Sequence, residues 1–361
     1  MYFSLQYKDF LSSLHHEDRE NLSPIAPTSL LENQHKYELT ESETNQIFNR
    51  KIFQQVINSR AFQRLKKIHF LGSIDYVIDP EGPKPNKRHT RYQHSLGVAK
   101  LALQFSRQRQ LTEREEILCV VSALLHDIGH PPLSHSLESV FKQEYGIGHH
   151  IVSERIIKGD VPIGYDLHKV LLNWGINPFE ILEIIHGTGP NPYREIFSYA
   201  INIDTIEAIL RSSTYVYENS LFWPPFEVLR ALLKRDADST HILDSFWRLK
   251  DEVYSKLINH RMGILADYVC QQYTRDHRSS FIEDYYYATE LELIAKHPRL
   301  FEFLKMLAAK EPSELLPDTK EIIFINRRFN INKKIILESI RSVNARYTQT
   351  RSEEVYRLTN N

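Results

Sequence analysis

Histidine is concentrated in one part of this sequence, next to a run of apolar residues. Seven of the 17 histidines lie between positions 89 and 150, and His126 is followed directly by Asp127. The preceding residues, Val120–Leu125, are apolar enough to form a helix that is buried on most sides. An imidazole and a carboxylate there are costly unless a partner compensates both, as a divalent metal ion does. The alternative is a helix C-cap with a surface ion pair, and the nearby histidines favour the metal site.

Four side chains from distant parts of the chain are candidate ligands for one ion. They are two imidazoles and two carboxylates: His94, His126, Asp127 and Asp204. Asp204 stands inside a strongly apolar helical pattern, where a carboxylate needs a cation or a hydrogen-bond donor. This donor set suits one divalent metal ion (Mn, Fe, Ni, Co, Zn or Mg) and leaves positions for water and a phosphoryl oxygen.

The hydrophobic pattern predicts an all-α fold, a bundle of at least ten helices with minor β elements. A capping box at Thr40–Glu43 opens the first long helix, and Pro131 and Pro132 must end the helix that carries His126. In the second helix we expect Arg64 to face solvent. Short strands are expected near 71–78 and 320–325. Helical spacing of apolar residues marks residues 47–57, 62–68, 96–102, 113–125, 137–141, 149–157, 167–174, 179–186, 195–212, 228–233, 242–268 and 290–307.

Composition places the chain among ordinary globular proteins, with 42% hydrophobic and 25% charged residues over 361 positions. No apolar run is long enough to span a membrane, so no membrane partner is expected. The first residues lack the pattern of a signal peptide. Cys119 and Cys270 stand in apolar helical patterns, which is typical of reduced core thiols and predicts a cytoplasmic location.

Charge is nearly balanced, with a formal net charge of −1, so total charge does not indicate nucleic acid as a partner. Two stretches are locally basic. Residues 84–91 lead into a helix N-terminus, an arrangement that suits phosphate and equally suits an exposed loop. Residues 320–346 could contact nucleic acid, but a solvated helix face over core isoleucines is the preferred interpretation.

The four candidate ligands resemble the H…HD…D signature of the HD-domain metal phosphohydrolases. Residues 60–68, 90–98, 125–135 and 246–270 further resemble the deoxynucleoside triphosphate triphosphohydrolases, including bacterial dGTPases. The resemblance covers about residues 45–270 and implies an HD-domain helical bundle. We accordingly divide the chain into an N-terminal arm (1–45), an HD phosphohydrolase core (46–215) and a C-terminal helical region packed on the core (216–361).

The resemblance implies a role for several polar residues. One divalent metal ion would be held by His94, His126, Asp127 and Asp204, with catalytic roles for His130, His135, Glu138 and His149. Glu138 would orient the catalytic histidine, which is His149 by spacing, with His150 as the alternative. Substrate contacts would come from Arg91, Leu71, His150 and Arg211. The implied reaction is attack of activated water on the α-phosphorus of a nucleotide, giving nucleoside and tripolyphosphate, in a homo-oligomer that a nucleotide effector could regulate.

The sequence differs from the family at positions that contact the substrate. Phe70 replaces a glutamine, and Thr205, Ala208 and Ser212 replace a lysine, a tyrosine and an aspartate, whereas Glu207 and Arg211 keep their character. Two alternatives therefore stay open. One is an HD phosphohydrolase acting on another nucleotide or on a nucleic acid end, and the other is a non-catalytic nucleotide-sensing subunit.

Overall fold

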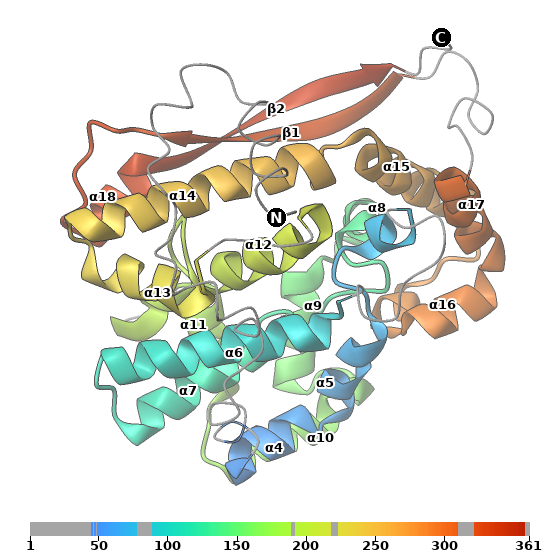
Figure 1. Ribbon diagram of the computed structural model, residues 1–361. Coiled ribbons are helices and arrows are strands. Elements are labelled where there is room, and N and C mark those ends of the chain that lie inside the picture. Colours follow the sequence, from blue (N-terminus) through green and yellow to red (C-terminus); the bar gives the residue numbers. More distant parts are fainter. Residues whose placement is uncertain are drawn as a thin grey trace, which may run out of the picture.

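We analysed a computed structural model of the 361-residue chain. It describes residues 45–77 (except 46 and 48), 89–188, 192–217, 223–309 and 321–357. The predicted N-terminal arm to residue 44, the capping box at Thr40–Glu43 and the basic residues 84–88 lie outside the described residues. Helices make up most of the described chain (Figure 1), which confirms the all-α fold class.

The helices of the first half surround the predicted site. They are α4 (Lys51–Ile57), α5 (Arg60–Arg64), α6 (Arg91–Gln108), α7 (Glu113–Leu125), α8 (His135–Tyr145), α9 (His149–Lys158), α10 (Tyr165–Asn173), α11 (Pro178–Ile185) and α12 (Ile203–Val216). The second half contains α13 (Pro225–Lys234), α14 (Ala237–Val253), α15 (Arg261–Asp276), α16 (Glu290–Lys296), α17 (Pro298–Ala309), β1 (Glu321–Ile331), α18 (Ile340–Arg346) and β2 (Tyr347–Arg357).

The centre of the fold is a stack of long helices. Helices α6 and α7 pack together, α12 packs on α6, and α14 packs on α12 (Figure 1). Capping boxes at Thr90 and Thr112 fix where α6 and α7 begin, because each threonine accepts a backbone N–H that the first turn leaves unpaired. Both cysteines are buried in this core and are free thiols, as predicted.

Three predicted helices are shorter than the hydrophobic pattern suggested, whereas the helix at 113–125 ends at Leu125 as predicted, ahead of the two prolines. Residues 195–212 form the helix α12 only from Ile203 onward, because Asn202 caps its N-terminus. Residues 242–268 form α14 and α15, separated by a single π-helical turn at Tyr254–Ile258, and His260 caps the second helix. Residues 290–307 are divided at Pro298, whose ring cannot continue α16 but suits the first turn of α17.

The C-terminal strands form a two-stranded antiparallel sheet that lies across α14 (Figure 1). Its register runs from Glu321 opposite Arg357 to Ile331 opposite Tyr347. The strand predicted at 320–325 is therefore confirmed from Glu321 onward and is longer than expected, while β2 was not predicted. The strand predicted near 71–78 is wrong within the described residues, because Gly72–Tyr76 form a 3-10 helical turn.

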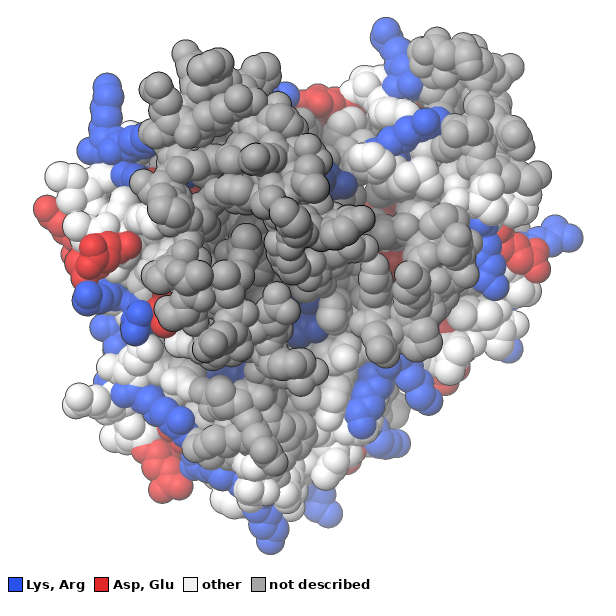
Figure 2. All heavy atoms as spheres, in the orientation of Figure 1, with Lys and Arg blue, Asp and Glu red and all other residues white. Residues whose placement is uncertain are grey.

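The visible described surface is mixed in charge. Figure 2 shows Lys and Arg side chains interspersed with Asp and Glu side chains around the rim of the molecule. Within the described residues no helix combines the length and the apolar character needed to cross a membrane. The predicted division into three segments stays a prediction.

Candidate metal centre and catalytic pocket

Three helices bring the four predicted metal ligands to one point. His94 lies in the first turn of α6, His126 and Asp127 directly follow α7, and Asp204 lies in the first turn of α12. Nε2 of His94 is 3.2 Å from Nε2 of His126, 3.2 Å from Oδ1 of Asp204 and 3.4 Å from Oδ2 of Asp127. The first three side chains are buried, whereas that of Asp204 is 41% exposed, so the point of convergence is reached from the α12 side.

The hydrogen bonds of the two imidazoles fix which nitrogen is free. Nδ1 of His94 lies 2.5 Å from Oε2 of Glu207, and Nδ1 of His126 lies 2.8 Å from the carbonyl oxygen of Ala123. Because both partners are acceptors, each Nδ1 donates to its partner, which leaves Nε2 of each ring as the atom directed at the carboxylates. Two Nε2 atoms this close together beside two carboxylates need a shared cation, either a proton or a metal ion. The residues therefore fit a divalent metal ion, and their role as its ligands stays a prediction.

Glu207 contacts Nδ1 of His94, the ring nitrogen that faces away from the other predicted ligands. The sequence had indicated no role for it. It lies three residues after Asp204 on α12, and it accepts hydrogen bonds from Arg211 as well as facing His94. Burial raises the pKa of Glu207, but Arg211 and His94 outweigh burial and lower it to about 2. Arg211, predicted to contact substrate, is thus held by Glu207 and by the carbonyl oxygen of Gln93. The i, i+3 spacing from Asp204 was the available signal.

Asp127 is surrounded by positive charge. Arg91 donates from Nη1 to Oδ2 of Asp127 at 2.6 Å, and Nε2 of His130 lies 3.3 Å from Oδ1. Although burial opposes ionisation, the charges of His126, His130 and Arg91 hold the pKa of Asp127 well below its usual value. Arg91 is itself buried and also donates to Oγ of Ser134 at 3.1 Å. The guanidinium predicted to bind substrate is therefore already paired with a predicted metal ligand.

A second group of histidines adjoins Asp127 and is organised by Glu138 of α8. One carboxylate oxygen of Glu138 lies 2.9 Å from Nδ1 of His135, and the other lies 2.8 Å from Nδ1 of His149. The rings of His130 and His149 stack, with centroids 4.3 Å apart and an interplanar angle of 12°. His150, the alternative catalytic residue, is exposed, and its ring centroid lies 4.0 Å from that of His149.

The turn between α7 and α8 is held in an unusual conformation. Leu133 and Ser134 have positive φ angles of 57° and 46°, which non-glycine residues rarely adopt. A Cβ atom on Gly72 would lie 2.2 Å from the carbonyl oxygen of Leu133, so only glycine fits against this turn. The backbone N–H of Leu133 donates to Glu290 of α16 at 3.3 Å. Consecutive strained residues of this kind are typical of functional sites.

Arg64 anchors the same turn, and the prediction that it faces solvent is wrong. Its side chain is buried, and Nη2 donates to the carbonyl oxygens of Ile128 and His130, both at 2.8 Å. Nη1 donates to the carbonyl oxygen of Ala288 at 3.1 Å. A guanidinium has five donors in one plane, so a single arginine satisfies carbonyls that the irregular turn leaves without helical partners. Helical periodicity alone placed Arg64 among its exposed basic neighbours.

The positions expected to contact the substrate include neighbours of the predicted metal ligands. Phe70 is buried, its ring centroid is 4.8 Å from that of His94, and the Arg91 guanidinium lies 4.9 Å above it. Leu71 is half-buried, and its N–H donates to Asp75 at 2.8 Å. Ala208 follows Asp204 by one turn on α12 and is half-buried. Two of the altered positions therefore carry an aromatic ring beside His94 and a methyl group one turn after Asp204.

Lys250 of α14 is a cation near this pocket that the sequence did not single out. It is buried, and its Nζ lies 4.6 Å from the ring centroid of Trp247 and 4.9 Å from that of Phe329. Burial lowers the pKa of Lys250 to about 8, while the charge of Asp204 acts in the opposite direction. Within the described residues no carboxylate forms an ion pair with this ammonium, which lies over the two aromatic rings instead.

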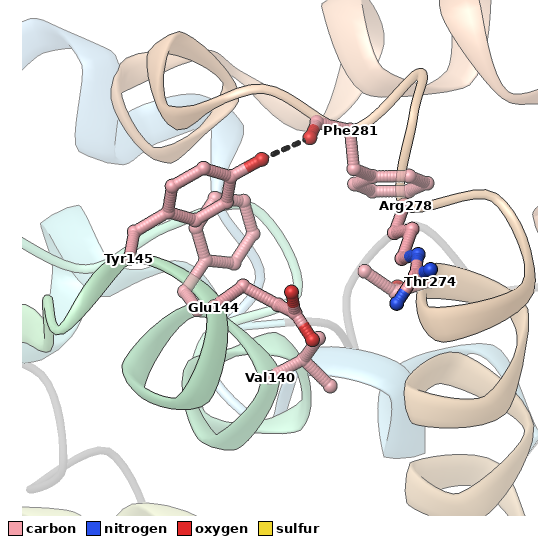
Figure 3. A pocket seen from close by; sticks show the side chains of 7 residues that line it. Val140, Glu144, Tyr145, Thr274, Arg278 and Phe281 are labelled. Carbon is pink, nitrogen blue, oxygen red and sulfur yellow. Dashed lines mark hydrogen bonds between the residues drawn. The ribbon is translucent and has the colours of Figure 1, made fainter.

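A separate small crevice lies between α8 and α15 (Figure 3). It is lined by apolar side chains together with Glu144 and Arg278, and the Tyr145 hydroxyl donates to the carbonyl oxygen of Phe281 beside it. It contains none of the predicted site residues. It therefore adds nothing to the metal centre.

Known proteins are similar to this chain in sequence. Residues 91–164 match the family model described as HD domain. The uncharacterized Bacillus subtilis protein YwfO is 26% identical over 246 residues, 65% of this chain and 53% of that protein. The deoxynucleoside triphosphate triphosphohydrolase SAMHD1 homolog of Dictyostelium discoideum is 24% identical over 80% of this chain and 53% of that protein. SAMHD1 of Bos taurus is 31% identical over 40% of this chain and 26% of that protein.

These similarities extend beyond the HD segment but not over whole relatives. The chain spans about half the length of YwfO and of the Dictyostelium protein. It contains an HD domain, and its resemblance to the deoxynucleoside triphosphate triphosphohydrolases is confirmed. The metal, the substrate and the reaction are matters for proposal.

Proposed function

We propose that this protein is a metal-dependent phosphohydrolase that cleaves a (deoxy)nucleoside triphosphate into nucleoside and tripolyphosphate. The observation that supports this most directly is the convergence of two imidazole Nε2 atoms, 3.2 Å apart, on the carboxylates of Asp127 and Asp204. A divalent metal ion held by these four residues would supply a Lewis acid that activates water and neutralises phosphoryl charge. Similarity to proteins named deoxynucleoside triphosphate triphosphohydrolases supports the substrate class.

The neighbouring histidines are suited to handling the proton. His149 is held by Glu138 through Nδ1, so its Nε2 is the nitrogen that would protonate the departing 5′-oxygen. The buried carboxylate fixes the tautomer and stabilises the imidazolium before the proton is given up. His135, tied to the same carboxylate and 62% exposed at its side chain, stands where a phosphate chain would enter. His130 lies between these two histidines and Asp127.

Positive charge is available for the phosphates on two sides. Arg91 lines the pocket beside Asp127, and Lys250 offers a buried ammonium near Asp204. An ammonium without a carboxylate partner gains strongly from a phosphate oxygen, because its desolvation has already occurred on folding. Lys250 would therefore take the part of the lysine that is absent at Thr205. Homo-oligomer formation and control by a nucleotide effector stay predictions.

The test is a product analysis with eight nucleotides. Metal-loaded protein, with its ion content measured, is incubated with the four dNTPs and the four NTPs, and products are followed by phosphorus NMR. Tripolyphosphate with loss of the nucleotide is expected, and His149→Ala should abolish it while His150→Ala retains it. No product from any nucleotide, with the ion in place, would refute the proposal.

A second candidate differs only in substrate. Phe70 and Ala208 place apolar surface where the family has groups that hold the sugar, so another nucleotide or a nucleic acid end could be the natural substrate. Orthophosphate or pyrophosphate in the same NMR spectra, in place of tripolyphosphate, would identify this case. Ligand-induced assembly that persists in Asp127→Ala without any turnover would instead indicate a sensor.

A further inference from the structure

We propose that the free edge of strand β2 binds the same edge of a second copy of this chain, so that two two-stranded sheets join into one four-stranded sheet. The free edge is the side of residues 349–355 that faces away from β1. The two copies pair antiparallel about a two-fold axis at Ser352. This interface concerns assembly and does not depend on the proposed hydrolysis.

Two backbone contacts show which groups of β2 face the free edge. In an antiparallel pair, residues that bond across the pair alternate with residues whose N–H and C=O groups point away. The Asn332 N–H donates to the carbonyl oxygen of Arg346 across the pair at 2.8 Å. The Phe329 N–H instead points away from β2 and donates to Asp251 of α14 at 3.1 Å. Both contacts fix the same alternation, so every odd-numbered residue in 349–355 turns its backbone groups to the free edge.

The free edge of β2 is long and regular. Within the described residues, the backbone groups on this edge have no hydrogen-bond partner. Helix α14 packs on β1, and β2 lies on the side of β1 away from that helix (Figure 1). The register continues over the eleven residues of β2 without a bulge, and the strand contains no proline. Because proteins usually protect an edge with a short strand, a bulge or a proline, an edge without them is suited to pairing with another strand.

The side chains of this edge are complementary in charge to those of a second copy. Arg351 and Glu353 lie two residues apart on one face of β2, and both are exposed. Within the described residues neither belongs to an ion pair, whereas Arg328 and Glu354 of the same ribbon pair at 3.7 Å. A two-fold axis at Ser352 sets Arg351 of each copy opposite Glu353 of the other. In such a pair the Cα atoms are about 5.5 Å apart and the side chains share one face.

Other two-fold registers lack this match. An axis at Arg351 or at Glu353 would place that residue opposite its own copy, and like charges directly opposite one another destabilise a sheet. The chain already has one such repulsion, because Arg327 of β1 lies opposite Arg351. A carboxylate that a second copy brings beside Arg351 would offset this repulsion. The charges therefore favour the register centred on Ser352.

Exposed apolar side chains lie on the same face, next to the free edge. Ile323 of β1 is 68% exposed, and Val355 directly opposite it is 49% exposed. Ile325, two residues further along β1, is 47% exposed. In the four-stranded sheet Val355 would lie opposite Gln349 of the second copy, so part of this apolar surface would leave water on pairing.

The experiment is sedimentation velocity of the full-length chain without nucleotide, over a range of protein concentrations. Arg351→Glu and Glu353→Arg should each halve the mass of the wild-type assembly, because either change sets like charges opposite one another on both sides of the axis. An equimolar mixture of the two variants should recover the wild-type mass, since two residues of one charge then face two of the other. The double variant Arg351→Glu/Glu353→Arg should recover it as well.

Lys333→Glu and Glu338→Arg are the matched controls, because they make the same changes of charge at exposed positions between the two strands. Both should keep the wild-type mass, and circular dichroism checks that every variant is folded. A wild-type chain that stays monomeric, single reversals that keep the wild-type mass, or a mixture that stays at half that mass would overturn the proposal. Because neither nucleotide nor turnover enters the measurement, failure here is distinct from failure of the hydrolase proposal.

Discussion

Carboxylates buried in two neighbouring regions of this protein behave in opposite ways. In the metal pocket, Asp127 and Glu207 face arginine and histidine, and the pKa of each is lowered despite burial. Around the turn Gly72–Tyr76, in a group that we call the polar layer, Asp75 and Asp267 accept hydrogen bonds from neutral hydroxyl and amide groups. Ser73 donates to Asp267 at 2.8 Å and the Leu71 N–H donates to Asp75 at 2.8 Å, yet burial raises the pKa of both carboxyls.

The difference shows what keeps a carboxylate charged inside this fold. Desolvation is the largest single influence on the pKa in both regions, so burial does not distinguish them. In the polar layer, neither the neutral donors nor the charge of His69 offsets desolvation, whereas a cation within hydrogen-bond reach does so in the pocket. A site that must present anionic ligands to a metal therefore needs its own arginines and histidines around those ligands.

The largest expected effect comes from removing the most strongly paired pocket carboxylate. Asp127→Ala would remove a predicted metal ligand and leave Arg91 buried without its partner, a loss of about 3–5 kcal/mol in the free energy of unfolding. Hydrolysis should fall by about a thousandfold or more. Denaturant unfolding, ion content and phosphorus NMR measure the three quantities. Asp267→Ala in the polar layer is the control and should retain the ion; retention of the ion in Asp127→Ala would contradict the comparison.

Glu138→Gln tests a pocket carboxylate that holds two histidines and none of the predicted metal ligands. An amide cannot accept from both Nδ1 atoms through two oxygens or stabilise an imidazolium, so kcat should fall about a hundredfold. The affinity for the metal ion should stay unchanged. Steady-state kinetics and equilibrium dialysis separate these effects, and an equal loss of ion binding would show that Glu138 supports the metal centre instead.

Glu207→Gln should weaken metal binding without impairing proton transfer to the leaving group. Loss of the charge behind His94 is expected to weaken ion binding about 10–100-fold. At saturating metal concentration the rate should return close to that of wild type. Chelator competition gives the affinity, and a rate that stays low at saturation would mean that Glu207 has a more direct role.

Asp75→Asn tests the polar layer through the pH dependence of the free energy of unfolding. The pKa of Asp75 is raised by burial from the ordinary 3.8 to about 6, so the folded state holds its proton longer than the unfolded state. The stabilisation from this protonated carboxyl is complete below about pH 4 and is lost as the pH rises through about 6. Relative to wild type, Asp75→Asn should thus gain of the order of 2 kcal/mol between pH 4 and pH 7. Urea unfolding at both pH values checks this, and a pH-independent difference would contradict it.

The smallest effect is expected from removing Lys142, an exposed cation that pairs with Glu138. Nζ of Lys142 lies 3.0 Å from Glu138, but the Lys142 side chain is 57% exposed and solvent screens its charge. Lys142→Met should change stability by less than about 1 kcal/mol and kcat by less than about twofold. A tenfold loss in kcat would show that surface cations contribute to holding Glu138 ionised.

The sequence predicted those parts of the site that carry their own signal. His126 and Asp127 follow an apolar run, and Asp204 interrupts one, so their burial and their need for a cation were readable from local pattern. Glu207 was missed despite its spacing from Asp204 and Arg211, because its partner His94 is far away in the chain. Arg64 was placed wrongly because all its partners are distant. Nothing near position 64 indicates that its guanidinium must satisfy carbonyls at 128, 130 and 288.

The fold was predicted to a similar extent. Helical periodicity gave the helices of the core, but not the interruption at Tyr254–Ile258, where the backbone changes to π-helical hydrogen bonding under an unbroken apolar pattern. Strand β2 reads TQTRSEEV in its middle and is mostly exposed, so it has no alternation of apolar residues. It is a strand because β1 pairs with it, and β1 is held by α14 through the Phe329 N–H to Asp251 at 3.1 Å.

Arg64, Asp204 and Glu290 share a property that bears on how this protein could be divided or shortened. All three lie outside residues 91–164, the segment that the HD model matches, yet two of them fix the turn that follows Asp127 and one completes the ligand set. A fragment limited to the matched segment would carry His94, His126 and Asp127 but would lack Asp204 and the groups that shape the turn. A fragment that keeps all of these groups reaches from α5 to α16, which is most of the chain and much more than its recognisable motif.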